Sequence, residues 1–339
     1  MALKSLVVGQ QEAQPLLPSA PDLINDLREA AMYQWQYFRI HRRFCNFENP
    51  RAFSEKIFHR MRYPLPEFSR LADKVLVRDY IRDTIGDQYN VPMYAVVDEV
   101  RPEHFAMLPD AFVIKANHSC GSLRIIPDKS VCDVVELSKT ANEWLKVDFS
   151  QYNHEKHYHD IRPRILFEKA LLVSGKPAPD YKIHVFNDAN GRSFSFLQVI
   201  DGRFGVTTQN LYSTDWLVMP FRIGGRLPGS LNPEITAPPE ELPEMVRIAK
   251  GLARPFGYCR VDMYVFEGQI YIGELTLTPG AGGCRFTPEQ WDWTLGSLFR
   301  WPEVPLTAPA RNAAEPAHSP VQTTECSCGR DEPKRANVA

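Results

Sequence analysis

Residues 260–280 read RVDMYVFEGQIYIGELTLTPG, two runs of alternating residues separated by a Glu-Gly pair. Alternation of this length predicts two strands, and the glycine between them predicts a β-hairpin. Counting outward from an odd-length loop over residues 267–269 places Asp262 directly opposite Glu274. A two-residue loop would instead put these two carboxylates on opposite faces of the hairpin.

Two carboxylates that face each other across a strand pair need an explanation. Opposed side chains have Cβ atoms about 5 Å apart, and like charges at that distance destabilise the pair. Either one carboxyl group is protonated or a cation lies between them. Oxygen ligands from Asp262 and Glu274, completed by water or phosphate, suit Mg²⁺. The alternative is two acids on a solvated strand face.

A second segment, FVIKANHSCGS at residues 112–122, runs from a predicted strand into a small polar loop. Such loops expose backbone N–H groups that can bind phosphate, and Lys115 adds a positive charge. The Walker A pattern is absent, so the alternative is a polar turn with an exposed lysine. Cys120 next to His118 could be a thiol nucleophile, but the sequence identifies no partner that would activate it.

A third segment combines strand patterns with charged residues. An apolar run beginning at Ile165 turns polar at Glu168 and Lys169, and Asp180 and Lys182 open the next strand. This pattern is typical of a sheet edge that meets a ligand. It also arises on any half-exposed strand.

The composition is typical of a globular protein, with 339 residues, 44% hydrophobic, 24% charged and a formal net charge of −2. There is no overall cationic excess of the kind that a non-specific nucleic-acid binder or a basic membrane-surface protein needs. No apolar run approaches the roughly 20 residues that span a bilayer, and the N-terminus lacks a signal-peptide core. Seven irregularly spaced cysteines suit a reducing compartment. We therefore expect a cytoplasmic protein with no nucleic-acid partner and no membrane span.

The chain has a helical first part and a strand-rich remainder, which predicts an α+β fold. Helices are predicted at residues 22–42, 53–62, 67–85, 131–146, 239–254 and 288–299. Strands are predicted at 94–98, 111–116, 165–173, 181–188, 192–200 and 204–212, before the hairpin at 259–276. The first helix places six residues on one stripe: Leu23, Leu27, Ala30, Ala31, Trp35 and Phe38.

The ends of the chain differ from its middle. Residues 1–20 and 302–339 are rich in proline and lack periodicity, so we expect both to be disordered. Residues 21–92 form an N-terminal helical region and residues 93–301 the main domain. Of the weaker motifs, the histidines around Glu155 in HEKHYH, residues 154–159, could bind a metal, but their irregular spacing favours a surface loop.

Taken in order along the chain, these segments resemble the TupA-like branch of the ATP-grasp superfamily, which is named for teichuronopeptide biosynthesis. The matching segments are NPRAFSEK at 49–56, LADKVLVRDY at 71–80, FVIKANHSCG at 112–121, PRI at 163–165 leading to Glu168, PDYK at 179–182, and RVD at 260–262 leading to GELTLTPG at 273–280. The resemblance covers about residues 45–301. It implies two α+β subdomains, a lid over roughly 93–172 and a metal-binding part over roughly 173–301, that clamp ATP between antiparallel sheets.

The resemblance also implies roles for single residues in binding ATP. Lys74 and Lys115 would contact the phosphates under a flexible lid at 117–123, while Glu168 and the backbone after it would hold adenine and Asp180 the ribose. The implied nucleotide ligands are Lys74, Lys115, Ser119, Gly121, Glu168, Lys169, Leu171, Asp180 and Arg203.

Metal and catalytic roles follow from the same resemblance. Asp262 and Glu274 would bind Mg²⁺, in agreement with the hairpin count. Thr276 stands where many ATP-grasp ligases have an asparagine ligand, so one metal contact is weaker or replaced by water. Arg260 would face the charge that develops on the transferred phosphate, and Lys182 would assist it.

The implied reaction joins a carboxylate to an amine through an acyl phosphate and releases ADP. ATP and Mg²⁺ would be the cofactors, and the partners would be small-molecule or polymer-linked carboxylate and amine substrates. The family implies a place in cell-surface polysaccharide or peptidic polymer biosynthesis. The alternatives are a phosphotransferase on the same scaffold and a non-catalytic, ATP-binding regulatory module.

Overall fold

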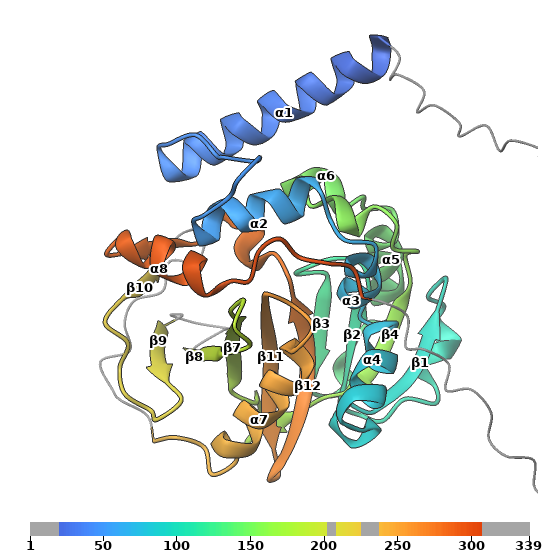
Figure 1. The fold of residues 1–339 in the computed structure, drawn as a ribbon. Coiled ribbons are helices and arrows are strands. Elements are labelled where there is room, and N and C mark those ends of the chain that lie inside the picture. The colour runs from blue at the N-terminus through green and yellow to red at the C-terminus, as the bar shows by residue number, and fades with distance from the viewer. Residues whose placement is uncertain (1–19, 202–207, 225–236, 307–339) are drawn as a thin grey trace, which may run out of the picture. The chain divides into compact units, whose positions relative to one another are not determined.

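A computed structural model describes residues 20–201, 208–224 and 237–306 of the chain (Figure 1). The two ends were expected to be disordered. Of these residues, only 20 and 302–306 lie within the described ranges, and the others lie outside them. Internal contacts divide the chain into residues 1–305 and 306–339. The description that follows concerns the first of these units.

Four helices open the described chain: α1 (Ala20–His41), α2 (Phe53–Arg62), α3 (Glu67–Ala72) and α4 (Val77–Ile85). The single helix predicted over residues 67–85 is wrong, because Asp73 interrupts it. The Asp73 carboxylate accepts hydrogen bonds from the backbone N–H groups of Val75 at 2.8 Å and Leu76 at 3.3 Å. An aspartate that binds the backbone donors just after it stabilises a turn in place of continued helix.

The helix expected over residues 22–42 is confirmed, but its apolar stripe is not the side that packs against the protein. Tyr33 and Tyr37 of α1 are buried, whereas Leu27 and Trp35 of the stripe are 67% and 62% exposed. In Figure 1, α1 lies above α2 and apart from the sheets. Among the described residues, no helix is long and apolar enough to cross a membrane.

An antiparallel four-stranded sheet takes its strands from residues 93–169. Its order is β1-β4-β2-β3, with β1 (Met93–Val97), β2 (Phe112–Ala116), β3 (Leu123–Ile126) and β4 (Ile165–Lys169). Helix α5 (Val134–Trp144) packs with β2 in a core that includes Phe112, Leu137 and Phe167. Strand β3 was not predicted, and it turns the polar loop after β2 into the tip of a β-hairpin.

An antiparallel five-stranded sheet takes its strands from residues 180–276. Its order is β12-β11-β7-β8-β9, with β7 (Asp180–Asn187), β8 (Ser193–Asp201), β9 (Thr208–Ser213), β11 (Tyr258–Phe266) and β12 (Gln269–Thr276). Helix α7 (Leu242–Ala253) packs against β7 and β11. The remaining elements are short: α6 (Ser150–Asn153), β5 (Leu172–Val173), β6 (Lys176–Pro177), β10 (Arg222–Gly224), β13 (Arg285–Thr287) and α8 (Gln290–Leu298).

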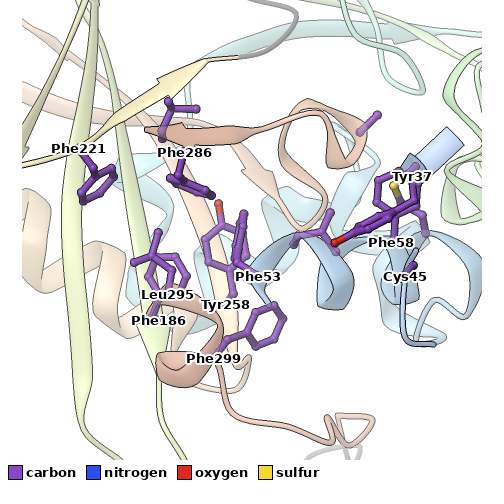
Figure 2. Close-up of a cluster of buried hydrophobic side chains, with 14 of the residues drawn as sticks. Tyr37, Cys45, Phe53, Phe58, Phe186, Phe221, Tyr258, Phe286, Leu295 and Phe299 are labelled. Carbon is purple, nitrogen blue, oxygen red and sulfur yellow. The ribbon is translucent and has the colours of Figure 1, made fainter. Parts of the chain in front are cut away.

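Aromatic side chains join the N-terminal helices to one end of the five-stranded sheet (Figure 2). Phe53 of α2 lies 4.9 Å from Tyr258 and 5.6 Å from Phe186, measured between ring centroids. Phe299, just after α8, lies 5.9 Å from Tyr258. Side chains of a strand alternate between faces, so this face also carries Lys182 and Asp262, further along the same strands. The aromatic contacts cover one half of this face, and the charged side chains Lys182 and Asp262 lie on the other half.

The packed part of the chain extends beyond the expected boundary at Trp301. The Glu303 carboxylate accepts hydrogen bonds from Arg60 Nε at 2.6 Å and from an Arg60 terminal nitrogen at 2.5 Å. The Arg60 side chain is only 1% exposed and also donates to the carbonyls of Leu277 and Tyr258. Glu303 therefore neutralises a buried charge.

Candidate active site

The β11–β12 hairpin confirms one part of the sequence prediction and contradicts another. Its tip is the two-residue turn Glu267-Gly268, with φ of +54° and +73°, so the odd-length loop is wrong. Asp262 nevertheless pairs with Glu274, because the register shifts beside Asp262, where Gly273 is an extra residue. A Cβ atom on Gly273 would lie 2.6 Å from the Tyr264 ring. This bulge compensates for the even-length turn.

A chain of contacts shows that the two carboxylates share one face of the hairpin. Arg260 Nε donates to Asp262 Oδ1 at 2.6 Å, and a terminal nitrogen of Arg260 donates to the Thr276 hydroxyl at 2.9 Å. The Thr276 hydroxyl donates to Glu274 Oε1 at 2.8 Å. The structure thus brings all four of these predicted residues together.

Lys182 of β7 joins the same cluster from the neighbouring strand, where it pairs in register with Asp262. Its ammonium group contacts the Asp262 carboxylate and lies 2.9 Å from Asp180 Oδ2. Burial would raise the pKa of Asp262, but Arg260 and Lys182 outweigh it and hold that pKa well below its usual range. Lys182 and Arg260 therefore supply positive charge beside the Asp262 carboxylate.

His184 and Gln198 belong to this face, and the sequence analysis missed both. His184 Nδ1 lies 2.9 Å from the Tyr258 hydroxyl, and Nε2 lies 3.2 Å from Gln198 Oε1. The imidazole stacks on Phe196 at 4.4 Å, and burial lowers its pKa to about 3. His184 is therefore neutral near pH 7. Its position two residues after Lys182 in a strand was the available signal.

Lys115 lies in the four-stranded sheet and ion pairs with Glu168, 2.5 Å from its Oε2 atom. Arg78 of α4 reaches the other oxygen of Glu168 at 3.4 Å. The Lys115 side chain is only 16% exposed, so the alternative of a polar turn with an exposed lysine is wrong. Two predicted nucleotide ligands are thus neighbours, and Arg78 is a third charged group that the sequence analysis missed.

The backbone after Glu168 was expected to hold a base. The Lys169 N–H donates to the Pro92 carbonyl at 2.9 Å, and the Leu171 carbonyl accepts from the Ala178 N–H at 2.9 Å. The Lys169 ammonium lies 4.9 Å from the centre of the Phe266 ring, near the tip of the β11–β12 hairpin. This contact links the end of β4 to the five-stranded sheet.

The interruption between α3 and α4 places Lys74 against the loop that follows β2. Its backbone N–H donates to the Asn117 carbonyl at 3.2 Å, and its ammonium group donates to the Ser119 carbonyl at 2.8 Å. The Ser119 hydroxyl is buried and has no hydrogen-bond partner within the described part of the chain. A buried hydroxyl without a partner is costly unless a ligand supplies one. Gly121 lies at the far end of the same loop, before β3.

The loop also approaches the carboxylate cluster. Cys120 is exposed as a residue, but partial desolvation by the surrounding protein raises the pKa of its thiol and Glu274 raises it further, while Lys74 and Arg260 lower it. A raised pKa keeps the thiol protonated, which disfavours the nucleophile alternative. The predicted residue Arg203 lies outside the described residues.

The histidine-containing segment at 154–159 is packed rather than a surface loop, which corrects that expectation. His157 is 2% exposed, and burial lowers its pKa to about 3. Glu155 is buried and accepts a hydrogen bond from the Thr278 hydroxyl, four residues after Glu274. Among the described residues, no group of three or more His, Cys, Asp or Glu side chains could hold a metal. A cation bound at Asp262 and Glu274 would therefore rely on these two carboxylates and on further oxygen atoms, such as those of phosphate or water.

Comparison with known proteins identifies one family. The model of the TupA-like ATP-grasp family matches residues 55–300. No curated protein sequence matches the chain significantly.

Solved structures that resemble the chain include three ligases or synthetases. An N5-carboxyaminoimidazole ribonucleotide synthetase bound to ADP is 17% identical, with 63% of this chain and 47% of that chain covered and a TM-score of 0.39. A D-alanine–D-alanine ligase from Bacillus anthracis bound to ATP is 18% identical, with 64% and 57% covered and a TM-score of 0.37. The corresponding enzyme from Helicobacter pylori is 15% identical, with 62% and 55% covered and a TM-score of 0.37. The chain thus spans about half the length of these structures.

Proposed function

The chain belongs to the TupA-like ATP-grasp family, and on this basis we propose that it is an ATP- and Mg²⁺-dependent ligase that joins a carboxylate to an amine. The observation that carries the proposal is the contact chain from Glu274 through Thr276 and Arg260 to Asp262 and Lys182. This chain of contacts joins two carboxylates, of the kind that bind metal ions, to two cationic side chains, of the kind that bind phosphate. All four lie on one half of one sheet face.

The side chains fit Mg²⁺ and a triphosphate. Asp262 and Glu274 offer only oxygen atoms, the donors that Mg²⁺ prefers, and Mg²⁺ typically uses one or two protein carboxylates together with substrate phosphates. The metal would supply positive charge that stabilises the phosphoryl oxygens. Arg260 and Lys182 now neutralise Asp262, and we propose that they bind phosphate oxygens when nucleotide is present.

The remaining predicted residues are proposed to bind the nucleotide. Lys74 and the buried Ser119 hydroxyl lie in or against the loop that approaches Glu274, so this loop would cover the phosphates and exclude water. Lys115 and Glu168 would lie further along the nucleotide, with Arg78 holding the Glu168 carboxylate in place.

In the proposed reaction, the substrate carboxylate attacks the γ-phosphorus of ATP and displaces ADP. The acyl phosphate that forms is then attacked by an amine, which gives an amide and releases phosphate. The protein needs no nucleophile of its own, because positioning and charge neutralisation by Arg260 and Lys182 lower the barrier. We propose that the substrates belong to cell-surface polysaccharide or peptidic polymer biosynthesis, as the family name suggests.

Trapping with hydroxylamine tests this reaction. The protein is incubated with Mg-ATP, hydroxylamine and a panel of uronic and amino acids, and ADP and hydroxamate are measured. The proposal predicts equal amounts of ADP and hydroxamate with one class of acid. Glu274→Gln should lower both yields together, while the exposed control Glu289→Gln should leave them unchanged.

The other outcomes separate the alternatives. A phosphorylated alcohol with no hydroxamate would show a phosphotransferase. ATP binding without ADP formation across the panel would show a regulatory module. Either result would contradict the ligase proposal.

A further inference from the structure

One side of α1 holds this helix against the rest of the protein. The Tyr33 hydroxyl donates to the His154 carbonyl at 2.6 Å, and the Tyr37 hydroxyl lies 2.9 Å from Ser54 Oγ. The Gln34 side chain exchanges hydrogen bonds with the Cys45 backbone at 2.7 and 3.0 Å. These contacts fix which side of α1 faces outward.

The outward side of α1 is apolar. Leu23, Ile24, Leu27 and Trp35 are each at least half exposed and fall on adjoining helical positions. Just beyond the helix, Phe44 is 73% exposed and stacks on Phe38 at 5.4 Å, which lengthens the apolar strip. We call the strip formed by Leu23, Ile24, Leu27, Trp35, Phe38 and Phe44 the α1 apolar face. A contiguous exposed patch of this kind marks an interaction surface.

Positively and negatively charged residues lie in different surroundings around the α1 apolar face. Arg28, Arg39 and Arg42 are exposed along the helix or directly after it. Asp26 and Glu29, the acidic residues among described positions 23–41, both ion pair with Arg62 on the attached side, at 2.7 and 3.3 Å. Glu29 also pairs with Lys156 at 2.7 Å. The described surface of α1 is therefore apolar with cationic side chains beside it, and the exposed acid of this part of the helix, Asp26 at 65%, is held in an ion pair with Arg62.

We propose that the α1 apolar face binds the surface of a membrane that contains anionic lipids. A helix with leucine and tryptophan on one side and arginines beside them inserts its apolar side at the headgroup boundary. Anionic headgroups then attract the arginines. A second copy of the chain is a poorer occupant, because its own face would present charge of the same sign. The overall net charge of −2 does not by itself oppose this binding, since Asp26 and Glu29, the acidic residues at positions 23–41, are both paired with Arg62.

Vesicle flotation with the full chain tests the proposal. The vesicles are pure phosphatidylcholine or equal parts phosphatidylcholine and phosphatidylglycerol. Leu27→Glu alters the α1 apolar face, and Leu217→Glu is the matched control, since Leu217 is 68% exposed beyond β9 and Leu27 is 67% exposed. Arg28→Gln with Arg39→Gln removes charge and keeps the apolar side chains. Circular dichroism melting of each variant checks that it folds.

The expected result is binding to the anionic vesicles that weakens with salt and is absent with phosphatidylcholine alone. Leu27→Glu should abolish binding and Leu217→Glu should not change it. The double arginine variant should bind more weakly, by about fivefold for each arginine. Failure to float with anionic vesicles, equal binding to both vesicles, or unchanged binding by Leu27→Glu would overturn the proposal. A dimer that Leu27→Glu dissociates, without vesicle binding, would assign the face to a second copy instead.

Discussion

Asp262 is the residue of the candidate site that contacts two cationic side chains. It is 4% exposed, and its carboxylate contacts both Arg260 and Lys182. Removing one partner of a buried ion pair is strongly destabilising because it leaves a buried charge uncompensated. Without the Asp262 carboxylate, Lys182 would keep only Asp180 among the described carboxylates, and Arg260 would lose its paired carboxylate. The stability of the ligand-free protein therefore depends on this carboxylate. The sequence analysis identified Glu274 as the neighbour of Asp262 across the hairpin, and the structure adds the Lys182 contact from β7.

The Asp262→Asn variant should be less stable without ligand, by about 3 kcal/mol of unfolding free energy. Two buried cations would then face a neutral amide. Glu274→Gln is the matched control and should change stability by less than about 1 kcal/mol, because Glu274 accepts its hydrogen bond from the neutral Thr276 hydroxyl. Urea denaturation measures both. Equal stability of Asp262→Asn and the unchanged protein would contradict the assigned charge balance.

His157 links stability to pH. Burial lowers its pKa to about 3, whereas a histidine in an unfolded chain has a pKa near 6.5. Between these values the unfolded chain binds a proton that the folded protein does not, so stability is full above about pH 6.5 and falls as the pH drops toward 3. His157→Phe should reduce the slope of unfolding free energy against pH, by about 1 kcal/mol per pH unit near pH 5. An unchanged slope would show that His157 becomes protonated in the folded protein.

At the scale of elements, the β11–β12 hairpin places its carboxylates through the bulge at Gly273 rather than through its turn. A side chain at this position would push against the Tyr264 ring, 2.6 Å from the new Cβ. Gly273→Ala should therefore shift Glu274 and lower the proposed ligase activity at least about tenfold, with a stability loss of about 1–3 kcal/mol. Gly268→Ala strains the turn but leaves the bulge intact, so it should lower stability alone. Full activity in folded Gly273→Ala would contradict this role of the bulge.

The elements themselves were largely predictable, and the exceptions have physical causes. Period-two and helical patterns located the hairpin, β2, β4, β7 and most helices, because burial of one face produces those patterns. The side chain of Asp73 divided one predicted helix into α3 and α4. The turn has an even number of residues, which alone would not pair Asp262 with Glu274. The bulge at Gly273 shifts the register by one residue and restores that pair. Local hydrogen bonds and extra residues of this kind leave little trace in hydrophobic periodicity.

At the scale of the whole molecule, the sequence located residues of the site but not their contacts. It grouped Arg260, Asp262, Glu274 and Thr276 correctly, because two paired strands carry all four. It missed His184 and the ion pair of Lys115 with Glu168, because these contacts depend on how the strands of each sheet are paired. It also could not show that the apolar stripe of α1 faces outward, since a stripe alone does not identify what it packs against.

The end of the folded unit provides a further prediction. Residues 302–339 were expected to be disordered, but truncation after Trp301 removes Glu303 and leaves the buried Arg60 guanidinium without its carboxylate. The shortened chain should lose about 3 kcal/mol of stability. Truncation after Leu306 keeps Glu303 and is the matched control. Equal melting temperatures for the two truncated chains would show that the Arg60–Glu303 pair contributes nothing.

The central claim is that the polar half of the five-stranded sheet binds Mg-ATP through Asp262 and Glu274. Calorimetric titration with ATP, with and without Mg²⁺, tests it most directly in the unchanged protein and in Glu274→Gln. We predict that Mg²⁺ tightens ATP binding by about tenfold or more in the unchanged protein. Glu274→Gln should lose that gain while its metal-free affinity stays similar. Failure of the protein to bind ATP, or the same Mg²⁺-dependent gain in Glu274→Gln, would contradict the claim.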